Sequence, residues 1–265
     1  PFHGFSVEFA QHREYVPGDD PRYLDEKIFA KSDRLVVKEF VEETNFACHL
    51  LVDRSASMRF ASRKWSKLDY ARWAAAALAY LVLSQRDTAG LVLFDTEAHD
   101  RVPPGNGAAQ AASILQLLER TEPAGETGVG QVLDWIGTRL RQRGIVCVLS
   151  DFLDEPERVI EGVRRLRSAG HEPILFQILD PREMDFDFDG QLRLDGLEGG
   201  SRVKIDAKSL RTAYREEVEQ HVEYLRDKSR AMGVDFVSMR TDEPLDVVLS
   251  TYLSARTARA RGGRR

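Results

Sequence analysis

Apolar and polar positions change in blocks along the chain, and from residue 45 onward the blocks predict strands and helices in turn. Nearly continuous apolar runs predict strands that are covered on both faces, and apolar residues at helical spacing predict helices that pack by one face. The expected strands are 46–52, 91–94, 99–102, 145–149, 174–179 and 234–239. The expected helices are 67–85, 108–119, a segment after residue 128, 156–168, 207–232 and 244–253.

Strands that alternate with helices predict the α/β fold class, with a mostly parallel central sheet and helices on both faces. The run 99–102 ends at Pro103-Pro104 and predicts an edge strand, because proline cannot donate to a central ladder. In sheets of this kind ligands bind beyond the carboxyl ends of the strands. The loops at that edge are therefore the first place to look for function.

Three segments fall outside this alternation and set the expected domain boundaries. Residues 1–44 are rich in turn formers and predict only a short helix at 25–31 and a strand at 35–41, so we expect an extension packed on the main domain. The main domain is expected to span 45–256. The basic segment 257–265 is expected to be a disordered tail, with an anionic partner as the second interpretation.

A β-hairpin insertion is expected at 184–206, inside the main domain. Two alternating pairs, Phe186/Phe188 and Leu192/Leu194, flank the turn formers Asp189-Gly190, and this pattern is typical of a hairpin. A further short strand is expected near 203–205.

Composition narrows the function classes. The net charge of −5 argues against a general nucleic-acid binder, whose surface would be basic. Cys48 and Cys147 each lie in an apolar run, which predicts buried residues and not a disulfide or metal pair, and this fits a reducing compartment. No apolar run approaches the roughly 20 residues that cross a membrane, and no signal peptide is visible. We expect a cytoplasmic protein.

The candidate chemistry lies where the first buried strand stops. The run Leu50-Leu51-Val52 ends in Asp53, and Ser55 and Ser57 follow at intervals of two. Asp151 follows strand 145–149 in the same way, and Thr127 comes from a loop that opens a helix. These oxygen donors suit Mg²⁺, Mn²⁺ or Ca²⁺. The alternative is that the residues are helix caps, a common role of Asp, Ser and Thr.

The usual companions of catalysis are missing from the sequence. It contains neither a phosphate-binding loop nor a Gly-x-Gly-x-x-Gly turn, a His-Glu-x-x-His motif or a Gly-x-Ser-x-Gly elbow. A phosphohydrolase with Asp53 as nucleophile would need an acid two residues on, where Ser55 stands. His49 lies inside an apolar strand and reads as a packed core residue. We therefore expect no enzymatic activity.

The chain resembles known families at these residues. Asp53-Arg54-Ser55-Ala56-Ser57, together with Thr127 and Asp151, resembles the metal-ion-dependent adhesion site of a von Willebrand factor A domain. More narrowly, almost the full chain resembles the bacterial domain of unknown function 58 family. The segments that carry this likeness are Glu8-Phe9, residues 13–22, Lys38-Glu39-Phe40, Ser150-Asp151-Phe152 and Asp180-Pro181-Arg182-Glu183.

The resemblance implies a fold and a set of roles. It implies a Rossmann-like three-layer sandwich of the von Willebrand factor A type. Ser55 and Ser57 would bind Mg²⁺ through their hydroxyls, Asp53 and Asp151 directly or through water, and Thr127 in at least one state; Mn²⁺ or Ca²⁺ are alternatives. A carboxylate of a partner would complete the coordination, and the expected partner is a MoxR-type AAA+ ATPase or its client. Two other hypotheses stay open: a scaffold with a vestigial metal site and a metal-dependent hydrolase.

Overall fold

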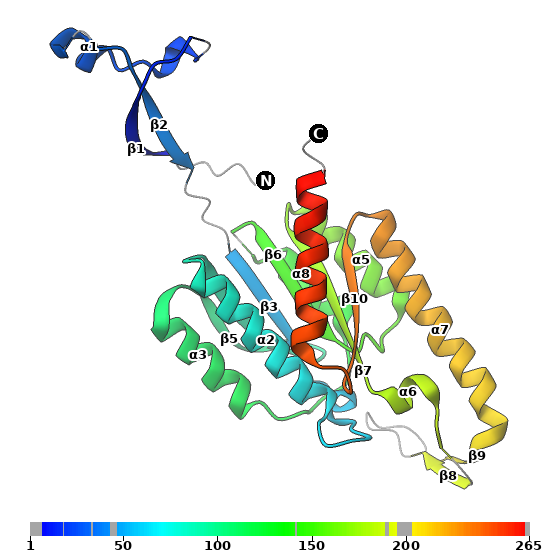
Figure 1. Cartoon of the computed structure of the whole chain (residues 1–265). Helices are drawn as coiled ribbons and strands as arrows, with labels where there is room; N and C mark the ends of the chain where they lie inside the picture. The colour runs from blue at the N-terminus through cyan, green and yellow to red at the C-terminus, as the bar shows by residue number, and fades with distance from the viewer. Residues whose placement is uncertain are drawn as a thin grey trace. The chain divides into compact units, whose positions relative to one another are not determined.

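The chain forms two units in a computed structural model that describes residues 7–17, 19–32, 34–42, 47–140, 142–188, 191–194 and 203–262 (Figure 1). Internal contacts divide it into residues 1–45 and 46–265. The sequence places this boundary one residue earlier. The expected packing of the first unit on the second stays a prediction, and each unit is described by itself.

The first unit is built on two antiparallel strands, β1 (Val7–Glu14) and β2 (Val36–Glu42). Between them lie a 3-10 turn, η1 (Pro21–Tyr23), and the helix α1 (Glu26–Ser32), which is the helix expected at 25–31. Strand β1 is not predicted by the sequence. Its register slips between Phe9 and Gln11, and such a bulge breaks the two-residue alternation that marks a strand.

The second unit holds a six-stranded sheet of order β10-β7-β6-β3-β4-β5. All neighbours are parallel except β5, which runs antiparallel to β4 at one edge. The strands are β3 (Ala47–Asp53), β4 (Thr88–Phe94), β5 (Ala98–Gly105), β6 (Gly144–Ser150), β7 (Glu172–Leu179) and β10 (Asp235–Arg240). Every residue of β3 is buried, as the continuous apolar run predicts.

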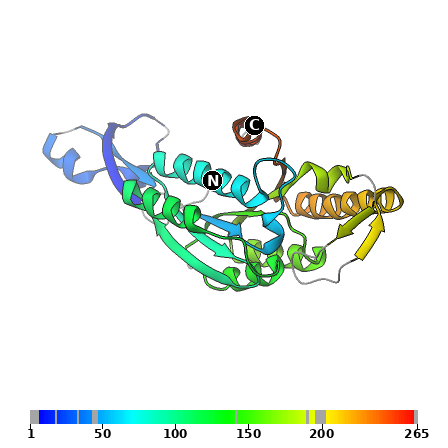
Figure 2. The same ribbon diagram turned by 90° about the horizontal axis from the view of Figure 1, so that it is seen from below.

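Helices cover both faces of this sheet, so the predicted α/β three-layer fold class is confirmed (Figure 2). On one face lie α2 (Lys67–Ser84), α3 (Gly107–Arg120) and α8 (Leu245–Gly262). On the other lie α4 (Val129–Gly137), α5 (Pro156–Ser168) and α7 (Ala207–Ala231). Alternate residues of β3 serve the two cores: Leu50 packs with the first group and Leu51 with the second.

The insertion differs in detail from the expected hairpin. A short helix, α6 (Pro181–Asp185), follows β7, and the hairpin strands are β8 (Gln191–Leu194) and β9 (Val203–Asp206). The strand expected over Phe186–Phe188 is wrong, because Phe186 has a left-handed backbone (φ 47°) and its ring packs on Tyr214 with a centroid distance of 4.5 Å. The turn Asp189-Gly190 lies outside the described residues.

The tail expected to be disordered from residue 257 is helical as far as Gly262, so that prediction is wrong for these residues. The reason is an ion-pair cluster on the last strand. Asp235 accepts hydrogen bonds from Arg256 (2.7 Å) and Arg259 (2.8 Å), which hold the final turns of α8 against β10. Residues 263–265 lie outside the described part of the chain.

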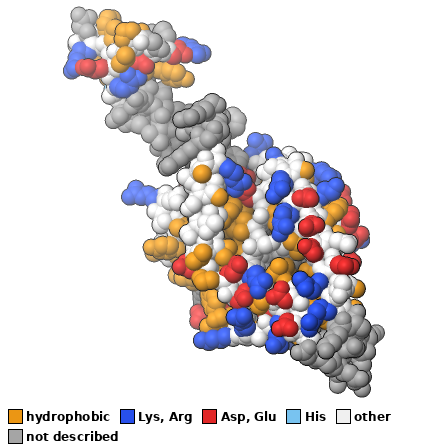
Figure 3. Space-filling model, turned by 45° about the vertical axis from the view of Figure 1, so that its right-hand side comes forward, with side chains coloured by type: hydrophobic (Ala, Val, Ile, Leu, Met, Phe, Trp, Pro, Cys, Tyr) orange, Lys and Arg blue, Asp and Glu red, His pale blue; other side chains and the backbone are white. Residues whose placement is uncertain are grey.

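The surface carries both signs of charge. On the face drawn in Figure 3, acidic and basic side chains are interspersed over the second unit and do not form one basic field. This distribution agrees with the net charge of −5. Within the described residues, none of the helices has the length and apolar character needed to cross a bilayer.

His49 is a buried titratable group in β3, and it predicts a specific pH dependence. Its side chain is 4% exposed, and burial lowers the pKa of His49 to about 4, against 6.5 in the unfolded chain. Between these values the unfolded state binds more protons, so stability falls as the pH falls. We expect His49→Leu to remove about 2–3 kcal/mol of the stability lost between pH 7 and pH 4.5.

Urea unfolding at both pH values measures this difference. Equal pH slopes for wild type and His49→Leu would contradict the prediction.

Candidate functional site

Polar side chains lie at the carboxyl ends of four neighbouring strands of the sheet. Strand β3 ends in Asp53, β6 ends in Ser150 before Asp151, and Asp95 and Asp180 follow β4 and β7. All of them are buried. Carboxylates and hydroxyls are costly to bury without partners, so the partners of these groups decide what this edge of the sheet can do.

The structure brings the five predicted residues together. The Ser55 amide donates to Asp53 Oδ1 (2.8 Å), and the Ser55 and Ser57 hydroxyl oxygens lie 3.1 Å apart. Ser57 Oγ in turn lies 3.4 Å from Thr127 Oγ1 and donates to Asp151 Oδ2 at 2.7 Å. Side chains from three loops therefore form one connected cluster of oxygen atoms.

Backbone contacts fix the loop that carries Thr127. The Ala56 amide donates to the Gly125 carbonyl (2.9 Å), and the Ala124 amide donates to the Arg54 carbonyl (2.7 Å). Gly125 has φ of 82° and lies directly against Asp95, where a Cβ would be 2.8 Å from the carboxylate. A glycine is needed here for both reasons, and the two hydrogen bonds hold Thr127 beside Ser57.

A buried lysine also enters the cluster. Lys67, the first residue of α2, is fully buried, and its Nζ lies 2.8 Å from Asp151 Oδ2 and 2.7 Å from Glu183 Oε1 on α6. Burial lowers the pKa of Lys67, but the two carboxylates outweigh burial and raise it above its ordinary value, so the ammonium stays charged. Lys67 neutralises part of the negative charge of the site.

Of the two candidate carboxylate ligands, Asp151 is hydrogen-bonded to Lys67, and no such bond joins Lys67 to Asp53 among the described residues. Burial, and then the charge of Asp151, raise the pKa of Asp53 to about 7. Its two oxygens accept from the Ser55 amide and from the Ser150 hydroxyl. A second positive charge close to Asp53 would offset both causes of the raised pKa.

The donor set is compatible with a hard cation, although carboxylates are few. Among the described residues no three His, Cys, Asp or Glu side chains are grouped for metal binding. The candidate ligands are two carboxylates and three hydroxyls, and Mg²⁺ prefers oxygen donors and keeps several waters. Any cation here would share the Asp151 carboxylate with Lys67.

Comparison with known proteins places the chain in a family. The family model described as "Protein of unknown function DUF58" matches residues 11–224. The chain belongs to the DUF58 family. An uncharacterized protein of Mycobacterium tuberculosis, Rv1480, is 28% identical over 267 aligned positions, which cover 98% of this chain and 83% of the relative. An uncharacterized protein of Mycobacterium avium, MAV169, is 27% identical and covers 62% of this chain.

Solved structures define the fold of this DUF58 protein. The conserved hypothetical protein BatB of Bacteroides thetaiotaomicron has a TM-score of 0.53 at 13% identity, covering 80% of this chain and 98% of its own. An aerotolerance-related membrane protein of Bacteroides fragilis has a TM-score of 0.50 at 14% identity, covering 77% and 96%. The fold is of the von Willebrand factor A type, as the sequence resemblance implied.

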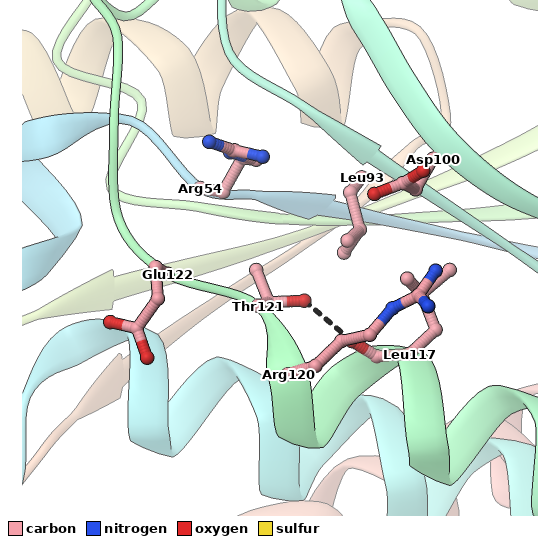
Figure 4. A pocket seen from close by; sticks show the side chains of 7 residues that line it. All are labelled: Arg54, Leu93, Asp100, Leu117, Arg120, Thr121 and Glu122. Carbon is pink, nitrogen blue, oxygen red and sulfur yellow. Dashed lines mark hydrogen bonds between the residues drawn. The ribbon is translucent and has the colours of Figure 1, made fainter.

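A hollow of about 380 Å³ lies next to the cluster in this DUF58 protein (Figure 4). It is bordered by Arg54 from the cluster's own loop, Leu93 and Asp100 from β4 and β5, and the C-terminal end of α3. Arg54 Nε lies 3.8 Å from Asp95 Oδ2 and has no hydrogen-bond partner among the described residues. Arg120 and Glu122 complete a rim of mixed charge.

Two residues that contact the carboxylates of this cluster in the DUF58 protein, and a third that contacts the lysine among them, are not predicted from the sequence: Ser150, Lys67 and Glu183. Lysine at the first position of a helix is unfavourable beside the positive end of the helix dipole, and this was the available signal for Lys67. Asp180-Pro181-Arg182-Glu183 has the spacing of a capping box, and α6 forms that cap. The same glutamate also reaches the lysine, which the spacing alone does not indicate.

Proposed function

We propose that this DUF58 protein is a non-enzymatic protein-interaction module with a metal-ion-dependent adhesion site. The observation that carries the proposal is the convergence of the Asp53, Ser55, Ser57, Thr127 and Asp151 oxygens from three loops. These residues would hold Mg²⁺, with Mn²⁺ or Ca²⁺ as alternatives. A bound cation would offer a coordination position to a carboxylate of the partner.

The chain's own residues would tune this contact. Ser55, Ser57 and Thr127 are neutral donors, which leave a cation more electrophilic towards an incoming anion. Arg54 borders the adjacent hollow and would favour an acidic partner segment. From the family resemblance we propose a MoxR-type AAA+ ATPase or its client as the partner, acting in the cytoplasm.

Association with a purified MoxR-type ATPase, measured in Mg²⁺ and in chelator, tests this proposal. We expect Asp53→Ala to abolish the Mg²⁺-dependent part of binding, a loss of about a hundredfold or more, because even outer-shell changes at metal sites cost 10–100-fold. Asp227→Ala, which removes an exposed carboxylate on α7, is the control and should bind like wild type. Binding that chelator and Asp53→Ala leave unchanged would refute the proposal.

A scaffold with a vestigial metal site is the second candidate, and one observation favours it. The Lys67 ammonium lies against Asp151, where it supplies the positive charge that a cation would otherwise bring. Calorimetric titration with Mg²⁺ and Mn²⁺ separates the candidates: binding heat that disappears in Asp53→Ala supports the adhesion site, and its absence in the wild type supports the scaffold.

A further inference from the structure

A surface of basic and aromatic side chains lies directly beside the cluster, on the segment 59–66 that leads from it into α2. Two hydrogen bonds to other loops hold this segment in place. Arg59 donates to the Pro123 carbonyl at 3.0 Å, and the Ser62 amide donates to Asp180 Oδ2 at 2.9 Å. The side chains that the segment presents to solvent are therefore positioned in advance of binding, which lowers the entropic cost of association.

Two tryptophans form the apolar part of this surface. Trp65, on the segment, and Trp73, on α2, are each 40% exposed. Their rings contact each other edge to face, with centroids 4.8 Å apart and an interplanar angle of 82°. Contiguous exposed aromatic side chains are typical of protein interaction sites. An aromatic ring of a partner would add a third member to this pair.

Three positive charges lie close to the tryptophan pair in the sequence. Arg59, Arg63 and Lys64 are all exposed, and Lys64 Nζ lies 4.3 Å from the centroid of the Trp65 ring. Arg63 pairs with Asp242 at 3.5 Å, but its side chain is 67% exposed. Neither Arg59 nor Lys64 has an acidic partner among the described residues. The surface therefore combines an apolar platform with positive charge that is only partly neutralised.

We propose that the partner segment captured at the cluster is an acidic peptide segment with an aromatic side chain. The ring packs on Trp65 and Trp73, and the carboxylates beside it lie against Arg63 and Lys64. This inference rests on the proposed function, because it describes the partner of that same site. Nucleic acid and anionic membranes are disfavoured, because the net charge of −5 and the interspersed acidic side chains seen in Figure 3 repel an extended polyanion.

Calorimetry with two matched peptides tests the proposal. Both peptides alternate glutamate and aspartate, and they differ only in a central phenylalanine or alanine. In Mg²⁺ we expect the phenylalanine peptide to bind wild type about tenfold tighter, because aromatic anchors dominate such contacts. Trp65→Ala should abolish this preference. Arg63→Gln combined with Lys64→Gln should weaken both peptides, and Arg230→Gln, which removes an exposed charge on α7, is the control and should bind like wild type.

Tryptophan fluorescence locates the contact. The chain has three tryptophans, so Trp135→Phe leaves Trp65 and Trp73 as its only indoles. The phenylalanine peptide should shift the emission of Trp135→Phe to shorter wavelength, because its ring covers the pair. The alanine peptide should shift it less at equal saturation. An emission that neither bound peptide shifts would place the contact elsewhere and overturn the proposal.

Chelator separates this proposal from the proposed function. Peptide affinities that are equal in Mg²⁺ and in chelator, with the phenylalanine preference kept, would refute the adhesion site and still support this surface. Three results overturn the proposal: no binding of either peptide at millimolar concentration, equal affinity of the two peptides for the wild type, or a preference that survives Trp65→Ala. An emission shift with phosphatidylglycerol vesicles or oligothymidylate, in the absence of peptide binding, also overturns it.

Discussion

Replacing Lys67 with methionine should lower the free energy of unfolding by about 3–5 kcal/mol, because the change leaves buried charges without their partner. The Lys67 ammonium is fully buried and contacts both Asp151 (2.8 Å) and Glu183 (2.7 Å). Methionine keeps the volume and the apolar stem, so packing loss contributes little. Urea unfolding at pH 7 measures the effect.

Two further variants identify the cause of this loss. Lys64→Met removes an exposed lysine three residues earlier and should change stability by less than about 0.5 kcal/mol. Adding Glu183→Gln to Lys67→Met should recover part of the loss, because one buried charge is then removed with its partner. A Lys67→Met protein as stable as the wild type, or a double variant less stable than the single one, would show that the lysine does not neutralise this cluster.

The Lys67→Met variant also tests whether the site binds Mg²⁺. Lys67 and a cation would compete for the charge of Asp151, so under the proposed function Mg²⁺ should stabilise Lys67→Met more than it stabilises the wild type. If the scaffold alternative holds, Mg²⁺ should leave the unfolding of both proteins unchanged. Unfolding of Lys67→Met without Mg²⁺ therefore tests the stabilising role of the lysine, and unfolding with Mg²⁺ tests whether the site binds a cation.

The position of the site could be predicted because it follows from topology. The buried runs that end at Asp53 and before Asp151 read as parallel strands, and parallel neighbours in a sheet bring their carboxyl ends to one edge. The position of Thr127 follows in the same way, because its loop opens a helix at the same edge of the sheet. Each of these predictions needs only the end of an apolar run and the direction of the strand.

The pairing of Lys67 with Glu183 could not be predicted, because it is a side-chain contact between residues 116 positions apart. Each residue has an ordinary explanation from the sequence alone: a lysine at a helix start can be solvated, and a glutamate there can be part of a capping box. The tail shows the same limit: its arginines read as a solvated basic run until Asp235 of β10 is known to lie beside Arg256 and Arg259. Long-range pairing of charges carries no periodic signal.

The hairpin was misplaced for a local reason. Phe186 and Phe188 satisfy a two-residue alternation, but the Asp180–Glu183 capping box starts a helix just before them. Arg211 of α7 donates to the carbonyls of Phe186 and Phe188 at 3.1 and 2.8 Å, which takes those groups out of strand pairing. The capping box therefore outweighs the alternation of two phenylalanines, and a helix forms just before them where the alternation predicts a strand.

Asp180→Ala should cost about 3 kcal/mol of unfolding free energy, because this fully buried carboxylate joins three loops. It accepts hydrogen bonds from the Ser62 amide (2.9 Å), the Arg182 amide (2.9 Å) and, at 3.4 Å, the Thr241 hydroxyl. Removing it leaves those donors unpaired and deletes the cap of α6, the helix that presents Glu183 to Lys67.

Hydrogen exchange and urea unfolding together test the role of Asp180. The Ser62 amide should lose protection in Asp180→Ala and keep part of it in Asp180→Asn, whose single amide oxygen still accepts. Asp185→Ala, at the exposed end of the same helix, removes only a 3.5 Å surface ion pair with Arg240 and should cost less than about 1 kcal/mol. If Asp180→Ala costs no more than Asp185→Ala, the carboxylate does not hold the loops together, and the placement of Glu183 beside Lys67 must depend on the packing of α6 against α7 instead.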